Sequence, residues 1–148
     1  MRKRTVALVP LVAMAMIAYF ALAASGAVIS GTSGPDVITS PPGTTNIILG
    51  KGAGDTLTGN GNKDVILGMA GGDTIDGSGS NDVLGGGADP DTITGGGGHD
   101  MITGDLGNDT VWANDGQQDF IDCGGEAGDV ANVDAIDSWM NCATVNVI

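Results

Sequence analysis

The hydrophobic positions between residues 50 and 112 recur every nine residues without a change of phase. Seven consecutive nonapeptides each begin with Gly, carry Asp at the sixth position and place an aliphatic residue at the eighth. These aliphatic residues are Leu57, Ile66, Ile75, Leu84, Ile93, Ile102 and Val111. A fixed period of this kind indicates a repeat architecture, in which each repeat is one structural unit.

Each half of the nonapeptide predicts a different element. The Gly-rich half is typical of a tight turn, because it needs backbone conformations that glycine adopts most easily. The other half, Asp-x-aliphatic-x, predicts a strand of about three residues, whose side chains alternate between two faces. If two nonapeptides form one coil of 18 residues, the aliphatic residues stack inward as a dry core. We therefore predict an all-β solenoid.

The same arrangement places the Asp residues in two columns, at the junctions between turn and strand. One column contains Asp55, Asp73, Asp91 and Asp109, and the other contains Asp64, Asp82 and Asp100. Adjacent coils are about 4.8 Å apart. Carboxylates at that spacing repel one another unless a cation lies between them.

The ligand chemistry favours calcium. Each site would combine an Asp from one coil, an Asp from the next and carbonyl oxygens of the turns, and such hard oxygen ligands suit Ca²⁺. Magnesium fits an all-protein cage poorly, because it prefers a strict octahedron with several waters. Softer metals are disfavoured, because the repeats contain no Cys and a single His, His99. The competing interpretation is a metal-free Gly-rich turn array, or disorder.

These repeats resemble the hemolysin-type calcium-binding (RTX) nonapeptide, GGxGxDx(aliphatic)x, closely over residues 50–112 and more loosely over 31–132. The resemblance implies a parallel β-roll, a right-handed β-solenoid with two nonapeptides per coil. It also implies that the seven Asp bind several Ca²⁺ ions together with turn carbonyls. The chain departs from the motif where other residues replace its second and fourth glycines: Lys51, Asn60, Met69, Ser78, Asp105, Ala53, Asn62, Ser80 and Asp89.

Degenerate repeats flank the regular array on its N-terminal side, over residues 28–49. Residues 31–39 match the nonapeptide and add Asp36 as a candidate ligand, and Asn46 occupies the Asp position of the next copy. The step from Asp36 to Asp55 is one residue too long, and we place the extra residue near Ser40. Terminal repeats are expected to be atypical because they cap the stack.

Degenerate repeats and a C-terminal cap follow over residues 113–148. Asp119 and Ile121 continue the pattern after a slip of one residue, and residues 124–132 form a last copy. Asp119, Asp122 and Asp129 are therefore further candidate ligands, whereas Asp134 and Asp137 are interpreted as cap or surface residues. Residues 134–142 are predicted to form one helical turn, with Trp139 and Met140 over the open end of the core. Residues 144–148 are predicted to form a final strand.

Cys123 and Cys142 are the only cysteines. In an exported chain such a pair indicates a disulfide, which would close a loop of about 20 residues. Two metal-binding thiolates are the alternative, although they lack further Cys or His ligands nearby.

The first 27 residues predict a secretory signal peptide. Arg2, Lys3 and Arg4 precede the apolar stretch 6–24, and small residues allow cleavage after Ala27, with a second candidate at 21–23. The alternative is an uncleaved anchor, because 19 uncharged residues approach the length of a membrane span. Either way we expect the rest of the chain to be secreted or displayed outside the cell.

The charge distribution argues for cations as partners. All 18 acidic residues follow residue 35, and without the first 27 residues the formal charge is 2 − 18 = −16. Such a surface argues against nucleic acids and anionic membranes. With only 3% aromatic residues the metal-free chain is predicted to be expanded, so that metal binding is coupled to folding.

The outward positions of the two predicted sheets differ in character. One face carries a Thr row with flanking residues at the ninth position: Thr56, Thr74, Thr92 and Thr110, flanked by Thr58, Asp76, Thr94 and Trp112. The other carries Ile47, Val65, Val83 and Met101, flanked by Leu49, Leu67, Gly85 and Thr103. An apolar patch of that size predicts self-association or a protein partner, although β-branched residues also simply favour strands. The two faces leave open an adhesin or an ice-binding solenoid.

No catalytic constellation is present in the sequence. His99 lies at a variable position of a turn, no G-x-S-x-G motif occurs, and the Asp residues are explained as metal ligands without an acid–base role. In the family that the repeats resemble, enzymes carry a separate catalytic domain, for which this chain has no room. We therefore expect a protein that is not an enzyme.

Overall fold

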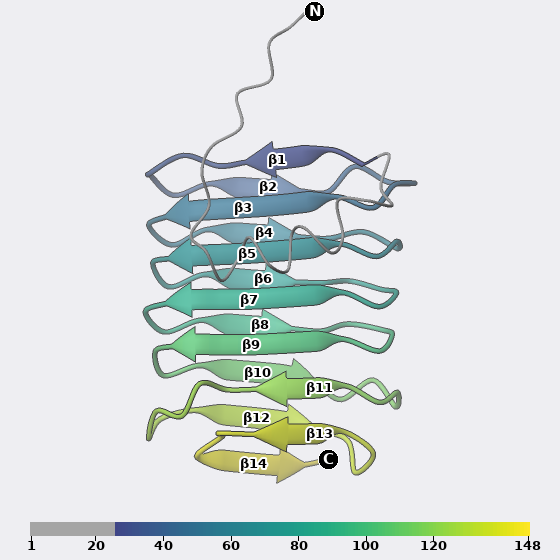
Figure 1. Cartoon of the computed structure of the whole chain (residues 1–148), viewed down its shortest axis with the longest axis vertical. Coiled ribbons are helices and arrows are strands. Elements are labelled where there is room, and N and C mark those ends of the chain that lie inside the picture. Colours follow the sequence, from purple (N-terminus) through teal and green to yellow (C-terminus); the bar gives the residue numbers. More distant parts are fainter. Residues whose placement is uncertain (1–25) are drawn as a thin grey trace, which may run out of the picture.

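The computed structural model describes residues 26–148, which form a β-solenoid of two parallel sheets (Figure 1). The chain runs along one sheet, crosses at a turn, returns along the other and descends by one coil. In Figure 1 the front strands run to the left and the back strands to the right as the chain descends, so the coil is right-handed. The predicted signal peptide or anchor, apart from its last two residues, lies outside the described residues.

Each sheet has seven strands. Sheet A consists of β1 (Val28–Ser30), β3 (Ile47–Gly52), β5 (Val65–Ala70), β7 (Val83–Ala88), β9 (Met101–Leu106), β11 (Phe120–Asp122) and β13 (Ser138–Met140). Sheet B consists of β2 (Val37–Thr39), β4 (Thr56–Thr58), β6 (Thr74–Asp76), β8 (Thr92–Thr94), β10 (Thr110–Ala113), β12 (Val130–Val133) and β14 (Thr144–Val147). The strands of sheet B have the length that the sequence predicts. Four strands of sheet A are twice as long, because pairing continues into the first half of the turn, as between Lys51 and Met69.

The aliphatic residue of every repeat lies inside the coil, as the period predicts. Ile48 pairs with Ile66 and Ile66 with Leu84 in sheet A, and Leu57 pairs with Ile75 in sheet B. All of these side chains are buried in one core between the sheets. Each fully buried Leu or Ile contributes about 1.5–3 kcal/mol relative to an exposed side chain. The core is thus a ladder with one large side chain per strand.

Additional residues at the two ends of the array are absorbed in turns. The turn 40–46 is one residue longer than the turn 59–64, which agrees with an extra residue near Ser40. Turns 114–119 and 123–129 take up the slips after residue 112. The register of the strands therefore continues unbroken from β1 to β13 and from β2 to β14.

The predicted helical turn over residues 134–142 is wrong. Residues 138–140 form β13, which pairs with β11 through Phe120 and Ser138, and through Ile121 and Trp139. The reason is that Asp137, Ser138 and Trp139 are one more Asp-x-hydrophobic copy, 18 residues after Asp119, so the coil continues. Trp139 follows the inward row but is 40% exposed, and Met140 lies in the outward row and is 46% exposed. The final strand, β14, forms as predicted.

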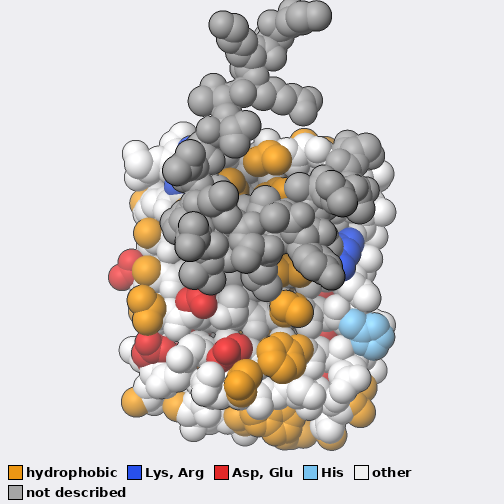
Figure 2. Space-filling model, in the orientation of Figure 1, with side chains coloured by type: hydrophobic (Ala, Val, Ile, Leu, Met, Phe, Trp, Pro, Cys, Tyr) orange, Lys and Arg blue, Asp and Glu red, His pale blue; other side chains and the backbone are white. Residues whose placement is uncertain are grey.

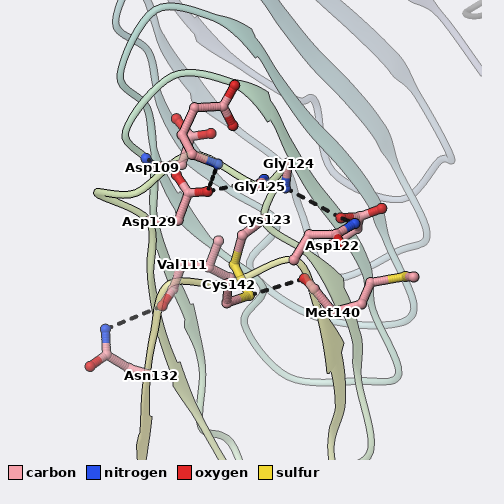
Figure 3. Close-up of a disulfide and its surroundings, with 12 residues drawn as sticks. Asp109, Val111, Asp122, Cys123, Gly124, Gly125, Asp129, Asn132, Met140 and Cys142 are labelled. Atoms are coloured by element: carbon pink, nitrogen blue, oxygen red, sulfur yellow. Dashed lines mark hydrogen bonds between the residues drawn. A yellow bond between two sulfur atoms is a disulfide. The ribbon is translucent and has the colours of Figure 1, made fainter.

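A disulfide joins Cys123 and Cys142, with 5.0 Å between their Cα atoms (Figure 3). The alternative of two metal-binding thiolates is therefore wrong. Cys123 is fully buried and belongs to the core cluster, directly after β11. Cys142 lies between β13 and β14. The bond thus fastens the last coil to the one before it.

The outer face of sheet A is apolar, but its exposure is uneven. Met101 and Phe120 are 45% and 46% exposed, whereas Val65 and Val83 are buried. All four residues lie side by side in one row of the sheet, in the order Val65, Val83, Met101 and Phe120. The expected exposed patch is therefore wrong for these two valines. Figure 2 shows apolar side chains gathered over the C-terminal strands.

Candidate metal-binding turns

Two series of turns connect the sheets, and we name them by the direction of the chain. The A-to-B edge contains the turns that lead into β2, β4, β6, β8, β10 and β12, and the B-to-A edge those that lead into β3, β5, β7, β9, β11 and β13. In six of the seven regular repeats, positions two and four have positive φ. Glycine is replaced at several of them, by Lys51, Ala53, Met69, Ser78, Ser80, Asp89 and Asp105. The turn conformation therefore persists where the motif glycine is lost.

The Asp residues of each edge form a hydrogen-bonded ladder. The Oδ1 atom of each Asp accepts the backbone N–H of the column residue one coil earlier, at 2.6–3.0 Å. On the A-to-B edge the donors and acceptors follow the order Asp36, Asp55, Asp73, Asp91, Asp109 and Asp129. On the B-to-A edge the order is Asn46, Asp64, Asp82, Asp100, Asp119 and Asp137. One oxygen of each carboxylate thus holds neighbouring coils in register.

The second carboxylate oxygen has a different environment in the middle of the stack. Within residues 26–148, the buried Oδ2 atoms of seven Asp residues have no hydrogen-bond partner. They belong to Asp55, Asp73, Asp82, Asp91, Asp100, Asp109 and Asp119. Leaving a buried charged oxygen without a partner costs more than about 1–3 kcal/mol per group. These atoms therefore mark positions that favour a cation.

The first glycine of each repeat explains where these oxygens point. At Gly68, an added Cβ would lie closer than 3.0 Å to both the Asp73 Oδ2 and the carbonyl oxygen of Gly86 on the next coil. The same pair, an Asp Oδ2 and a carbonyl oxygen one coil on, surrounds Gly50, Gly77, Gly86 and Gly104. The glycine therefore leaves room for a carboxylate and a carbonyl oxygen that converge from adjacent coils.

Burial and neighbouring negative charges disfavour the ionised form of the column carboxylates. Burial away from water, with a smaller contribution from neighbouring Asp100 and Asp64, raises the pKa of Asp82 to about 8. Burial likewise raises the pKa of Asp91 and Asp119 to about 7 and that of Asp73 to about 6. The pKa values of Asp100 and Asp109 are also raised, mainly by burial. Protons or metal cations are thus the species that neutralise these columns.

The donor set fits a hard cation. No group of three or more His, Cys, Asp or Glu converges on one point in residues 26–148, as a site made only of side chains would require. The convergent atoms are instead pairs of carboxylate and backbone carbonyl oxygens, the ligands that Ca²⁺ takes at 2.3–2.6 Å. Within these residues the turns therefore suit calcium better than zinc or a soft metal.

The ends of the columns differ from the middle. The Oδ2 of Asp36 accepts the backbone N–H of Thr32, that of Asp129 accepts those of Gly125 and Glu126, and that of Asp137 accepts that of Asp134. These terminal carboxylates are thus satisfied by the protein itself. The role of Asp36 as a ligand stays a prediction.

Two acidic residues near the C-terminus lie in other surroundings than the sequence predicts. Asp137, interpreted from the sequence as a cap or surface residue, is buried in the B-to-A column, because the coil continues through β13. Asp122 lies outside the columns, where it accepts hydrogen bonds from Gly124 and Asn141. Sequence reasoning missed Glu126, whose buried Oε2 has no hydrogen-bond partner in the described part of the chain. No period could have revealed it, because it stands at a variable turn position.

His99 does not join the columns. Its Nδ1 atom lies 2.8 Å from the carbonyl oxygen of Gln118. The ring borders a surface hollow that is also lined by Asp100, Phe120 and Ser138. The ring makes no hydrogen bond to Ser138, the one hydroxyl among these lining residues.

Comparison with protein families supports the same interpretation. The family model of the RTX calcium-binding nonapeptide repeat (4 copies) matches residues 43–75, 58–93 and 85–117. Together these matches span 43–117, which is 75 of the 148 residues. Comparisons with curated proteins and with solved structures gave no significant match.

Proposed function

We propose that this chain, which belongs to the family of RTX calcium-binding nonapeptide repeats, takes up calcium ions between successive coils along both edges of its solenoid. The observation that carries the proposal is the set of buried Asp Oδ2 atoms without a hydrogen-bond partner in residues 26–148, all but that of Asp119 beside a first-position glycine. A calcium ion would supply positive charge between two carboxylates and accept carbonyl oxygens as further ligands.

The regular repeats offer five intervals between coils. On the A-to-B edge these lie between Asp55 and Asp73, Asp73 and Asp91, and Asp91 and Asp109. On the B-to-A edge they lie between Asp64 and Asp82, and between Asp82 and Asp100. Asp119 extends the second series by one more interval, because it continues the hydrogen-bonded ladder. In each interval the carboxylates bind the ion, and the first-position glycine keeps the space between them open.

We also propose that calcium uptake and folding are coupled. The columns place buried carboxylates on consecutive coils, so the stacked state is costly without a cation. Outside the aliphatic ladder the chain has little apolar surface to bury, with 3% aromatic residues. Binding energy from the ion would therefore appear as folding energy.

The proposed setting is outside the cell. Proteins with these repeats are typically exported, and the basic and apolar start of this chain suits a signal peptide. No helix in residues 26–148 is long and apolar enough to cross a membrane. Abundant extracellular calcium would fill even weak sites.

We propose a structural or interaction module rather than an enzyme, because repeats of this family are typically non-catalytic. The interaction surface would be the outer face of sheet A, where Met101 and Phe120 are exposed and adjacent in one row. A second copy of the chain is the proposed occupant. Sedimentation of the wild type and of M101K/F120K would test this, and a wild type that stays monomeric at high concentration would contradict it.

Circular dichroism during a calcium titration tests the main proposal. The processed chain in EGTA should show little sheet signal, gain it as calcium is added, and lose it again on chelation. Calorimetry should detect calcium uptake over the same range. A chain that keeps its full sheet signal after exhaustive chelation and binds no calcium would refute the proposal.

A matched pair of variants locates the sites. Asp82→Asn removes a column carboxylate that faces two intervals, and it should lower the number of bound calcium ions by at least one. Asp76→Asn removes the same charge from the exposed outer face of sheet B, where Asp76 pairs with Thr58 and Thr94. Its calcium binding should match the wild type. Equal stoichiometry in D82N and D76N would mean that the columns are not the sites.

A second candidate function uses the Thr row of sheet B. Thr56, Thr74, Thr92 and Thr110 lie in register on consecutive strands. Such a regular hydroxyl array is compatible with ice binding or adhesion, although Asp76 and Trp112 interrupt the flanking row. Thermal hysteresis in the presence of calcium would support ice binding, and its absence would exclude it.

A further inference from the structure

We infer that the turn 40–46 closes without a metal ion, because the side-chain amides of Asn46 and Asn60 occupy the place that calcium takes in other turns. The inference rests on the proposed function and deepens it, since it separates turns that need calcium from one that does not. The two asparagines come from consecutive coils of the B-to-A edge, just as two ligand Asp residues would.

Both amide nitrogens lie within hydrogen-bond distance of the same three oxygen atoms. Asn46 Nδ2 lies 2.7 Å from Ser40 Oγ, 3.3 Å from the Pro41 carbonyl oxygen and 2.7 Å from the Thr44 carbonyl oxygen. Asn60 Nδ2 lies 2.8, 3.0 and 3.1 Å from the same three atoms. One hydroxyl and two carbonyl oxygens thus converge on a single point. Hard cations use such oxygen clusters as ligands, but here N–H donors satisfy them.

The turn 59–64 is adapted to the same arrangement. Asn60 and Asn62 are the two motif positions in the regular repeats that lack positive φ, so the backbone of this turn departs from the other six. The Asn60 backbone N–H donates to Asp64 Oδ2 at 2.8 Å, and Asn62 N–H donates to Asn60 Oδ1 at 2.7 Å. Asp64 is accordingly the one regular column Asp absent from the set with unpartnered Oδ2 atoms in residues 26–148.

Charge supports the assignment as well. Asn46 holds a column position, with its backbone N–H bound to Asp64 Oδ1 and its Oδ1 bound by the backbone N–H of Ala27. The neutral amide therefore keeps the ladder but contributes no charge that a cation would have to offset. At this end of the B-to-A edge, hydrogen bonds alone keep the turn 40–46 ordered, whereas the turns that follow depend on calcium.

Restoring the repeat motif should create a calcium site. N46D/N60G replaces the two amides by the Asp and Gly of the regular nonapeptide. We expect this variant to bind one calcium ion more per chain than the wild type, measured by equilibrium dialysis or calorimetry at saturating calcium. N146D, which adds the same charge on the outer row of sheet B next to Asn132, should bind the wild-type number. A double variant that folds and binds only the wild-type number would overturn the inference.

A single truncation tests the hydrogen bonds directly, even if the double variant fails to fold. N60A should increase hydrogen exchange at the backbone amides of 40–46 about tenfold in saturating calcium, while leaving the calcium stoichiometry unchanged. N62A, in the same exposed turn, should leave that exchange as in the wild type. Unchanged protection in N60A would overturn the inference. If the wild type takes up no calcium at all, the proposed function fails, whereas the exchange of N60A still shows whether the amides hold the turn.

Discussion

At the scale of single residues, the first-position glycine and the sixth-position Asp act as a pair. The Asp Oδ2 lies in space that a side chain at the glycine would take, as between Gly68 and Asp73. Conformational freedom is not the reason for this glycine, because its φ is not positive. The second and fourth positions do need positive φ, and Lys51 and Ser78 adopt it there without glycine.

Gly68→Ala should therefore weaken calcium binding. The new Cβ would collide with Asp73 Oδ2 and the Gly86 carbonyl oxygen, and overpacking of this kind costs about 1–3 kcal/mol. That cost corresponds to a calcium midpoint raised about 5-fold to 150-fold in a circular dichroism titration. Gly61→Ala is the matched control, because nothing lies within 4 Å of its added Cβ. Equal midpoints for the two variants would contradict the assignment of this space to ligands.

At the scale of elements, the Asp columns make the stability of the fold change with pH in opposite directions with and without calcium. The raised pKa values of Asp73, Asp91, Asp119 and Asp82, from about 6 to about 8, mean that the folded metal-free state binds more protons than the unfolded state above about pH 4. Stability of the metal-free fold is therefore greatest in acid and is lost as the pH rises through about 8. Calcium competes with these protons, so its affinity should rise over the same range.

Urea unfolding at pH 5, 6.5 and 8 measures this effect. Without calcium the sheet signal, and with it any urea midpoint, should be greatest at pH 5, where protons neutralise the columns, whereas in calcium the midpoint should be highest at pH 8. D82N/D91N should flatten the dependence in EGTA, because it removes two of the raised carboxyl groups. A midpoint in EGTA that increases with pH would show that the carboxylates are stabilised by some means other than protons or metal.

At the scale of the whole molecule, the solenoid has two edges lined by Asp columns, where we propose that calcium binds, and two ends where the stack is closed. The terminal carboxylates Asp36, Asp129 and Asp137 are satisfied by backbone N–H groups, so the need for cations is concentrated between the ends. The disulfide fastens the last coil, where β13 and β14 each have a neighbour on one side. The stack is thus closed covalently at one end and by asparagine amides at the other.

Removal of the disulfide should destabilise this end first. C123S/C142S loses a constraint over a sequence separation of 19 residues, worth about 3 kcal/mol in the chain-entropy model. We expect a lower unfolding midpoint in calcium and faster hydrogen exchange in β13 and β14, while the calcium stoichiometry of the regular repeats is retained. Protection that falls equally along all strands would indicate that the last coil is no separate unit.

The sequence by itself determined the solenoid, its inward aliphatic ladder, the two Asp columns and the paired cysteines. A period of nine residues with alternating side chains permits one such arrangement, and all seven regular repeats carry the same pattern of Gly, Asp and aliphatic positions. The tertiary structure decided what happens where the period fails. It placed Ser138–Met140 as a further strand instead of a helical turn, and it brought Asp137 into a column. It also set the amides of Asn46 and Asn60 on the same three oxygens. These outcomes depend on contacts between residues about 18 positions apart, whose register is fixed by pairing with the neighbouring coil and not by local sequence.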